Sequence, residues 1–244
     1  MINIVIPMAG EGSRFKNAGY ARPKPFIDVA GKLMIERVLD NLNYHDASFY
    51  LICRSEHILN DKQFIDKIKS QYNVVFIPIQ LLTQGSACTV LFARKFINNG
   101  IPLMIANSDQ LVDTNIGDFI EDCKKRKLDG SIMTFIDNNK DPKWSFAKIN
   151  ADNLVIETKE KTPISQYATV GIYLYSKGSY FVDAAIDMII NEDRVKNEFY
   201  TCPTYNYLIR EGLKIGIFNI EQEMMHGLGT PEDLVSYIKT KQNK

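Results

Sequence analysis

The chain lacks an excess of charge of either sign. Lys and Arg together number 29 among its 244 residues, Asp and Glu also number 29, and the formal net charge is zero at pH 7. Nucleic-acid backbones and anionic membranes both select for a surplus of positive charge, so the composition favours neither as a partner. A few cations gathered in one loop are still enough to bind a small phosphorylated ligand.

Cysteine is also scarce: Cys53, Cys88, Cys123 and Cys202 are spread along the chain without a C-x-x-C pair. This pattern is typical of buried, reduced thiols in a cytosolic protein. No apolar run approaches the length that crosses a bilayer. The apolar segment Ile2–Met8 lacks a basic leader and is too short to be a signal peptide. We therefore expect a soluble cytoplasmic protein with neither a membrane nor a nucleic acid as partner.

Short apolar runs alternate with stretches of helical spacing through the first half of the chain. The expected strands are Ile2–Pro7, Phe49–Cys53, Val74–Pro78 and Pro102–Ala106, and the expected helices are Lys32–Asn43, Asp61–Gln71, Gly85–Asn98 and Ile116–Arg126. This alternation predicts a parallel sheet with helices on both faces. In such sheets, ligands bind beyond the carboxyl ends of the strands.

The pattern changes from Gly130 onward, where strands follow one another with little helix between them. We expect strands at Ser131–Ile136, Ala147–Ile149, Leu154–Glu157, Thr169–Tyr175 and Lys214–Asn219, and helices at Ser179–Ile190 and Glu198–Arg210. A last helix should begin at Pro231 with Thr230 as its N-cap and fray over residues 239–244.

These patterns predict one α/β domain over residues 1–244. Its expected architecture is a three-layer α/β/α fold with a mostly parallel central sheet and a small mixed subregion on the acceptor side. We expect residues 1–129 to bind a nucleotide and residues 130–244 to bind and select an acceptor.

A glycine-rich stretch follows the first expected strand. Residues 9–25 read Ala-Gly-Glu-Gly-Ser-Arg-Phe-Lys-Asn-Ala-Gly-Tyr-Ala-Arg-Pro-Lys-Pro. Gly10 and Gly12 let the backbone come close to an oxygen-rich ligand. Arg14 can hold two phosphate oxygens at once, and Lys24 offers a compact positive charge. The loop lacks the third glycine of a Rossmann fingerprint and the Gly-Lys-Ser/Thr of a Walker A loop, and we expect it to bind a nucleoside triphosphate.

Residues 7–26 resemble the nucleotidyltransferases related to sugar-1-phosphate nucleotidylyltransferases, whose signature is a strand, then G-x-G-[ST]-R, then Pro-Lys. The resemblance extends over nearly the whole chain. It implies a Rossmann-like nucleotidyltransferase fold of the GT-A type and a reaction in which an acceptor phosphate attacks the α-phosphorus of a nucleoside triphosphate and pyrophosphate leaves. It also implies that Arg14 holds the β- and γ-phosphates, that Lys24 holds the α-phosphate region, and that Ala9 and Ser13 line the nucleotide.

The segment Gln84-Gly85-Ser86-Ala87 resembles the part of the family that reads the nucleobase. By this resemblance Gly85 lets the base lie against the backbone, Ser86 faces the base or ribose, and Gln80 and Gln84 are side-chain readers. A carboxamide both donates and accepts hydrogen bonds, so either glutamine suits cytosine as well as uracil. An ordinary helix start with Ser86 near the cap is the alternative interpretation of the segment.

Asp109 follows the fourth expected strand in a segment, Asn107-Ser108-Asp109, that resembles the one in which the family places a Mg²⁺-binding Asp. A single carboxylate is adequate because Mg²⁺ takes one or two carboxylates together with phosphate oxygens and water. Asn107 would orient the ribose or support Asp109. Many relatives carry a second acidic ligand where this chain has Gly227; water or one of three acids is the expected substitute: Glu198, Glu221 or Glu223. His226 is a further candidate for phosphate or metal contact.

The acceptor side resembles the family in the segment Glu157–Pro163 and in the glycine-bearing strand with Gly171. By this resemblance Lys161 holds the phosphate of the acceptor, while Glu160 and Glu198 contact its other polar groups. The sugar enzymes usually have a glycine in the segment where this chain reads Trp144-Ser145-Phe146-Ala147. This departure suggests a small polar or zwitterionic acceptor, with Trp144 as a wall. Cys202 has no nearby base and is not expected to be a nucleophile.

Within the family, the combination of motifs most resembles the cytidylyltransferases that activate a phosphorylated small molecule, such as those acting on phosphoglutamine in capsular phosphoramidate synthesis or on choline phosphate. The resemblance implies CTP and L-glutamine phosphate as substrates, Mg²⁺ as cofactor, and a role in modifying a surface polysaccharide. Two alternatives stay open: a sugar-1-phosphate nucleotidylyltransferase, and a regulatory protein that binds a nucleotide without turnover. A homo-oligomer is also left open.

Overall fold

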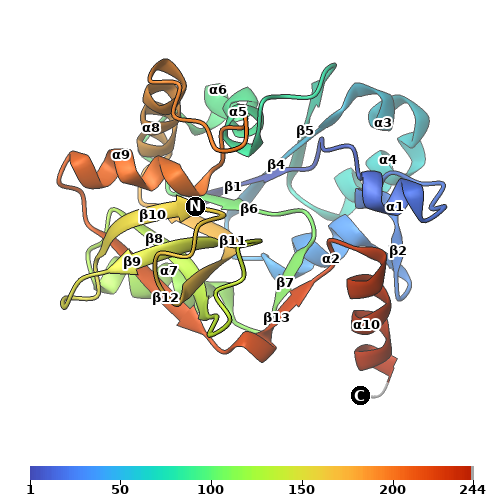
Figure 1. Cartoon of the computed structure of the whole chain (residues 1–244). Helices are drawn as coiled ribbons and strands as arrows, with labels where there is room; N and C mark the ends of the chain where they lie inside the picture. The colour runs from blue at the N-terminus through green and yellow to red at the C-terminus, as the bar shows by residue number, and fades with distance from the viewer. Residues whose placement is uncertain (243–244) are drawn as a thin grey trace.

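The structure, a computed structural model, describes residues 1–242. A nine-stranded sheet runs through it with helices packed on either side (Figure 1). Strands β5 (Val74–Ile79), β4 (Ala47–Arg54), β1 (Ile2–Pro7) and β6 (Leu103–Ala106) lie next to one another in that order and are parallel. This confirms the predicted three-layer α/β fold with a mostly parallel central sheet.

The side chains of β1 alternate between two hydrophobic cores. Ile2, Ile4 and Ile6 pack in one core together with residues of α2 (Met34–Asn41), α4 (Lys62–Gln71) and α7 (Ile116–Lys125). Val5 points to the opposite face, where α5 (Ser86–Val90), α8 (Gly178–Ile190) and α9 (Tyr205–Arg210) form the second core. Successive residues of a strand face opposite sides of a sheet, so a strand covered on both faces is apolar at nearly every position.

The second half of the chain completes the sheet. Strand β11 (Tyr167–Tyr175) pairs antiparallel with β6 and joins the parallel centre to β8 (Gly130–Ile136), β9 (Ser145–Ile149), β10 (Val155–Glu160) and β12 (Ile215–Ile220). Two short pairs stand apart from this sheet: β2 (Asp28–Val29) with β3 (Lys32–Leu33), and β7 (Gln110–Val112) with β13 (Met225–Gly227). The second pair brings a late segment of the chain beside the end of β6.

Two expected helices need correction. Gly85–Asn98 divides into α5, a 3₁₀ turn over Leu91–Ala93 and α6 (Arg94–Ile97). In Glu198–Arg210, helix begins only with a 3₁₀ turn at Cys202–Thr204, followed by α9. The reason is tertiary, because the backbone of Phe199 donates to the Gln84 carbonyl and accepts from the Ala87 amide. Those groups are therefore unavailable for a helical turn.

The remaining helices are α1 (Ser13–Asn17), α3 (Ser55–Asn60) and α10 (Pro231–Gln242). The predicted cap of α10 is confirmed, since the Asp233 amide donates to the Thr230 hydroxyl at 3.1 Å. The helix continues to Gln242, and the rest of the stretch expected to fray, residues 243–244, lies outside the described residues.

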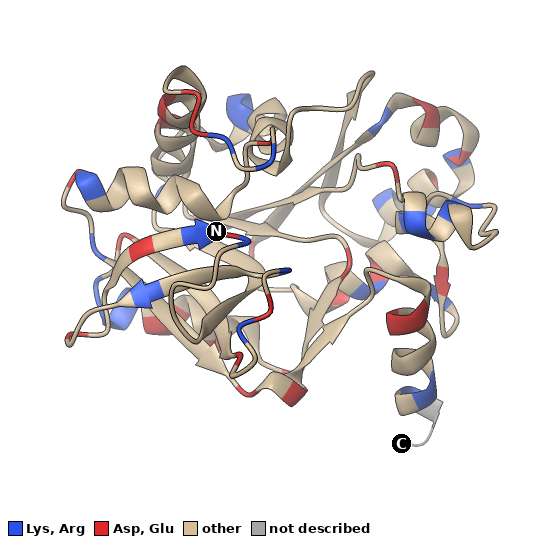
Figure 2. Cartoon of the chain, in the orientation of Figure 1, with Lys and Arg blue, Asp and Glu red and all other residues tan. Residues whose placement is uncertain are grey.

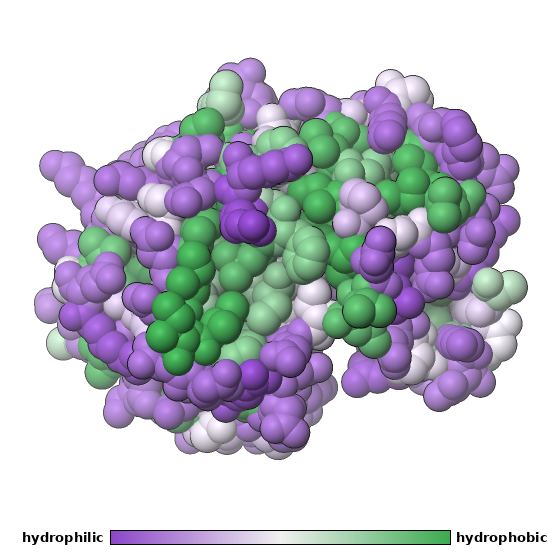
Figure 3. All heavy atoms as spheres, turned by 90° about the horizontal axis from the view of Figure 1, so that it is seen from above, coloured by the Kyte–Doolittle hydropathy of each residue, from purple (hydrophilic) through white to green (hydrophobic). Residues whose placement is uncertain are grey.

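Charged residues of both signs are interspersed over the elements in Figure 2 rather than gathered on one side. The surface seen in Figure 3 is mostly polar with apolar areas between; exposed apolar residues include Leu81, Leu82, Phe92 and Ile190. Among the described residues, no helix has both the length and the apolar character that crossing a bilayer requires.

Candidate active site

Two adjoining cavities open at the carboxyl ends of β1 and β6. The larger cavity has a volume of about 690 Å³ and the smaller about 310 Å³, and Asn107 and Asp109 line both. Residues from both halves of the chain line the larger cavity, among them Arg14, Ser86, Trp144, Glu160, Gly171 and Tyr200. The site therefore lies where parallel α/β sheets bind their ligands, beyond the ends of the strands.

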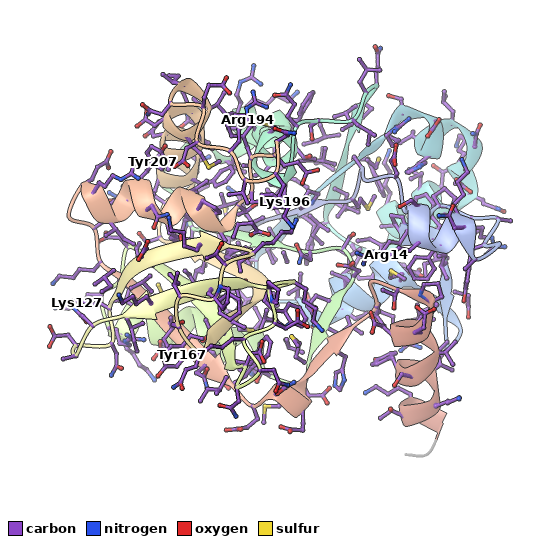
Figure 4. All side chains as sticks on the ribbon, viewed as in Figure 1. Arg14, Lys127, Tyr167, Arg194, Lys196 and Tyr207 are labelled. Atoms are coloured by element: carbon purple, nitrogen blue, oxygen red, sulfur yellow. The ribbon has the colours of Figure 1, made fainter. Side chains whose placement is uncertain are left out.

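The glycine-rich loop wraps around the smaller cavity. Gly10, Gly12 and Lys24 line it. Gly12 caps α1 with a left-handed backbone, φ +61°, and a Cβ there would lie 3.2 Å from the Cβ of Lys24. A larger residue would thus be strained and would crowd the lysine. Arg14 extends from α1 toward the larger cavity, as its label in Figure 4 helps to locate, so the loop supplies one cation to each cavity.

Lys24 and Asp109 form an ion pair at the boundary between the two cavities. Their side chains are 19% and 25% exposed, respectively. These residues are 85 positions apart in the chain, and the structure brings them together as the positions of β1 and β6 in the sheet predict. A cation and a carboxylate that neutralise each other here can exchange partners when an anionic ligand and its metal ion arrive.

The segment that follows β13 packs against Asp109. The Leu228 amide donates to the Asp109 carbonyl at 2.7 Å. A Cβ on Gly229 would lie 3.1 Å from Oδ2 of Asp109, and a Cβ on Gly227 would lie 3.9 Å from Oδ2 of Asp233. Asp109 and Asp233 both line the larger cavity, so one short turn has a carboxylate beside each of its two glycines.

Asp233 was not singled out from the sequence. The signal that points to it is its place in the first turn of a capped helix directly after Gly-Leu-Gly. Glu198, Glu221 and Glu223, the predicted substitutes for a second ligand, are exposed and are not among the residues that line either cavity. No group of three or more metal-binding side chains occurs in the described part of the chain. Mg²⁺ does not require one, because phosphate oxygens and water supply its other ligands.

His226 is engaged elsewhere. Its Nε2 lies 2.8 Å from Oδ2 of Asp113, and its ring centroid lies 5.5 Å from that of Tyr237. It is not among the residues that line the two cavities. The contact between His226, on β13, and Asp113, directly after β7, instead links these two strands.

The segment expected to read the base is held by backbone contacts. Gly85 has φ +114°, and a Cβ there would lie 2.4 Å from the Phe199 carbonyl oxygen, so only glycine fits. The Ser86 hydroxyl bonds to Thr201, whose amide donates to it at 3.0 Å. Ser86 also lines the larger cavity.

The two candidate glutamines differ in their contacts. Arg194 donates to the side-chain oxygen of Gln84 at 2.9 Å. Gln80 is exposed, and its amide makes no hydrogen bond to another described residue. Neither glutamine is among the residues that line the two cavities, so a role for either side chain in reading a base stays a prediction.

Gly171 permits the close crossing of β11 over the end of β6. Its φ is +89°, and a Cβ there would lie 2.2 Å from Nδ2 of Asn107. The Asn107 amide donates to the Gly171 carbonyl at 3.1 Å. Asn107 therefore reaches both cavities because residue 171 has no side chain. Of the other predicted nucleotide-binding residues, Ala9 is buried in the core and Ser13 is exposed at the start of α1.

The acceptor side of the larger cavity has a buried acidic floor. Glu160 is 7% exposed and accepts a hydrogen bond from the Ser145 hydroxyl. Burial raises the pKa of Glu160, although the Ser145 bond and the charge of Lys161 act in the opposite direction. Trp144 forms one wall, with its ring edge-on to Phe135 at 5.3 Å between centroids.

Lys161 contacts Tyr200, a residue of the larger cavity's wall. Its ammonium contacts the Tyr200 hydroxyl and lies 4.3 Å from the centre of the Tyr200 ring. Tyr200 lines the larger cavity, whereas Lys161 is not among its lining residues. Burial and the nearby Glu198 carboxylate raise the pKa of Tyr200, so its hydroxyl stays protonated. Cys202 also lines the cavity, and burial raises the pKa of its thiol, which disfavours the reactive thiolate.

A parallel sheet with a cationic glycine-rich loop and a carboxylate at the end of the neighbouring strand is an arrangement typical of proteins that bind nucleotides. Comparison with known families specifies the class further. Residues 4–238 match the nucleotidyl transferase family, and the chain belongs to it.

The relatives are distant and longer. The chain is 26% identical over 215 residues to the bifunctional protein GlmU of Methanococcus aeolicus, covering 80% of this chain and 48% of that protein. It is 24% identical over 239 residues to the bifunctional protein GlmU of Clostridium novyi, covering 93% of this chain and 49% of that protein. The chain thus spans about half the length of the curated relatives it matches.

A solved structure of similar size resembles the whole fold. The crystal structure of a nucleoside-diphosphate-sugar pyrophosphorylase from Vibrio cholerae matches with a TM-score of 0.83 and 26% identity, covering 97% of this chain and 99% of that one. The predicted family resemblance is confirmed at this level. The comparisons do not test the expected preference for CTP and phosphoglutamine, which stays a prediction.

Proposed function

We propose that the protein is a Mg²⁺-dependent nucleotidyltransferase that joins the nucleoside monophosphate part of a nucleoside triphosphate to a small phosphorylated acceptor and releases pyrophosphate. The observation that carries this proposal is the meeting of Lys24 and Asp109 between two cavities, one of which also contains Arg14. In this assignment residues 1–129 bind the nucleotide and residues 130–244 bind the acceptor.

The chemistry follows from how the cations are placed. An oxygen of the acceptor phosphate forms a bond to the α-phosphorus, the bond from that phosphorus to the bridging oxygen breaks, and the electron pair leaves with pyrophosphate. Lys24 and Arg14 bind the triphosphate and stabilise the charge that builds on the leaving group. Lys161, held over the ring of Tyr200, lowers the repulsion between the two phosphates that must approach each other.

The residues present suit a magnesium ion. Asp109 would hold it, and Asp233, which also lines the larger cavity, is the candidate second ligand. Bound Mg²⁺ supplies positive charge that neutralises phosphate oxygens. Asp109 pairs with Lys24, and in this proposal the carboxylate binds the metal ion when Lys24 turns to a phosphate.

We assign a sugar 1-phosphate as the acceptor. Support comes from the name of the similar Vibrio cholerae structure, a nucleoside-diphosphate-sugar pyrophosphorylase. The cavity floor agrees with this class, because the Glu160 carboxylate and the Ser145 hydroxyl can bind sugar hydroxyls. This assignment replaces the expectation of phosphoglutamine as the first choice.

A CTP-dependent enzyme acting on L-glutamine phosphate is the second candidate. The observation that favours it is the acceptor wall, where Trp144 and Ser145 stand in the segment in which the sugar enzymes usually have a glycine. A bulky indole beside the floor reduces the room for a sugar ring, and its face can pack against a short chain.

Pyrophosphate release measured across a panel of substrates tests the proposal. CTP, UTP, TTP, ATP and GTP are each combined with Mg²⁺ and with a hexose 1-phosphate, a hexosamine 1-phosphate, choline phosphate or L-glutamine phosphate. We expect release with a sugar 1-phosphate. Release only with CTP and a non-sugar acceptor supports the second candidate, and nucleotide binding without release under every condition identifies a regulatory protein instead.

A further inference from the structure

A short hairpin leads into the wall of the larger cavity, which its last residues, Tyr200 and Thr201, line. It consists of residues Arg194–Thr201, called the strap below, between α8 and the 3₁₀ turn at Cys202. Val195 and Glu198 exchange two backbone hydrogen bonds, of 2.9 and 3.0 Å. Lys196 and Asn197 between them have φ +49° and +65°, the backbone of a tight two-residue hairpin turn. Figure 4 labels Arg194 and Lys196 on this loop.

The turn places Arg194 opposite Phe199. The guanidinium carbon lies 4.3 Å from the centre of the Phe199 ring, and Phe199 itself is 1% exposed. From this position Arg194 donates to the side-chain oxygen of Gln84 at 2.9 Å. Arg194 therefore links its own hairpin to the buried ring of Phe199 and to Gln84, the first residue of the segment Gln84–Ala87.

The strap and the segment Gln84–Ala87 are also joined along their backbones. The Phe199 amide donates to the Gln84 carbonyl at 2.7 Å, and the Ala87 amide donates to the Phe199 carbonyl at 3.0 Å. Ser86 and Thr201 bond next to these contacts. The two segments consequently have to move as one unit, with the Arg194 contact at its outer edge.

The same strap holds the acceptor-side lysine. Tyr200 lies between Phe199 and Thr201, and its ring and hydroxyl contact the ammonium of Lys161. A displacement of the strap therefore changes the base-side segment and the position of Lys161 together. Arg194 adds a side-chain contact to the backbone bonds that hold the strap, and this contact lies apart from the residues assigned to the phosphates.

We propose that Arg194 is a positioning residue that fixes the strap and, through it, sets the affinities for the nucleotide and the acceptor together. This inference rests on the proposed function for the identity of the two substrates. Arg194 touches neither of them, because its contacts are to Gln84, Phe199 and Glu192. Coupling of this kind is reciprocal, so each substrate should favour binding of the other by the same factor.

Arg194→Ala, Arg194→Lys and Arg210→Ala test the proposal in the full chain. Arg210 is the matched control: its guanidinium also lies over a ring, 4.5 Å from the centre of Tyr207, but both residues belong to α9 and neither is part of the strap. In Arg194→Ala we expect the KM values of both substrates to rise by about threefold to tenfold, as the loss of one solvent-exposed hydrogen bond implies, with kcat changed less than twofold. Arg194→Lys keeps a donor and should recover part of the affinity.

Hydrogen exchange gives a readout that does not need turnover. Exchange of the Phe199 and Ala87 amides should quicken in Arg194→Ala and stay unchanged in Arg210→Ala, while the amides of β1 are unaffected in both. A rise in only one KM, or exchange in Arg194→Ala that equals the control, overturns the proposal. If the natural protein releases no pyrophosphate at all, the proposed function fails while the exchange comparison still decides whether Arg194 fixes the strap.

Discussion

Replacement of Lys24 by alanine separates the role of the central ion pair in catalysis from its role in stability. The pair with Asp109 is partly exposed, with 19% and 25% of the two side chains accessible. Ion pairs near solvent contribute about 0.2–1 kcal/mol to folding. A loss of that size lowers the melting temperature of a domain of this length by no more than about 2–4 °C.

The expected effect on catalysis is much larger. Lys24 lies at the boundary of the two cavities, and in the proposed mechanism it stabilises the negative charge that builds on the departing pyrophosphate. Loss of one group that is fixed in place to stabilise such charge costs about 2.7–4 kcal/mol in the transition state, or roughly 10²–10³ in kcat. We therefore expect Lys24→Ala to be folded and nearly inactive.

The assay is pyrophosphate release under saturating nucleotide and acceptor, together with thermal unfolding of the same samples. Lys16→Ala is the control, because Lys16 is an exposed cation of the same loop region, in α1. If Lys24→Ala retains activity within about threefold of this control, the reasoning that places the triphosphate beside Lys24 is refuted. Unfolding of Lys24→Ala at room temperature would equally contradict the small stability term.

Three further perturbations test other parts of the site. Asp233→Asn is expected to weaken Mn²⁺ binding in the presence of nucleotide by about tenfold or more, measured by electron paramagnetic resonance. Glu232→Gln in the same turn should not weaken it, and Gly227→Asp added to Asp233→Asn should restore it, since nothing lies within 3.9 Å of a Cβ at residue 227. Glu160→Gln should raise the melting temperature at pH 7. Burial raises the pKa of Glu160 above its ordinary 4.5, so the folded state holds that proton more tightly than the unfolded chain, and stability is lost as pH rises from 4.5 through the folded pKa. The gain should disappear below pH 4.5, and a gain that is the same at every pH contradicts it. Cys202→Ser should keep kcat within about threefold, because the buried thiol stays protonated; complete inactivity of a folded variant would show that the sulfur takes part.

The sequence predicted the parts of this protein that local chemistry determines. Strands covered on both faces are apolar throughout, so β1 and β6 were recognisable, and their order in the chain was enough to bring Lys24 and Asp109 together. Thr230 was recognisable as a cap because its pattern is also local: a hydroxyl residue followed by proline and acidic residues is typical of a helix start.

The parts that depend on distant contacts were not predictable. Residues 198–201 have an acceptable helical pattern, but the backbone of Phe199 bonds to Gln84 and Ala87, which no local pattern indicates. Arg194 and Asp233 are ordinary charged surface residues in the sequence. The first matters because a hairpin turn sets it against Phe199, and the second because β13 pairs with β7.

The pairing of Lys24 with Asp109 has a consequence for which ligands the site can bind. A free divalent cation would have to displace an ammonium that already satisfies the carboxylate, and a free inorganic phosphate would have to draw that ammonium away from its carboxylate. Each separate ion leaves one of these two partly exposed charges without a partner, whereas a metal–nucleotide complex satisfies both at once. The site should therefore bind a metal–nucleotide complex in preference to either simple ion alone.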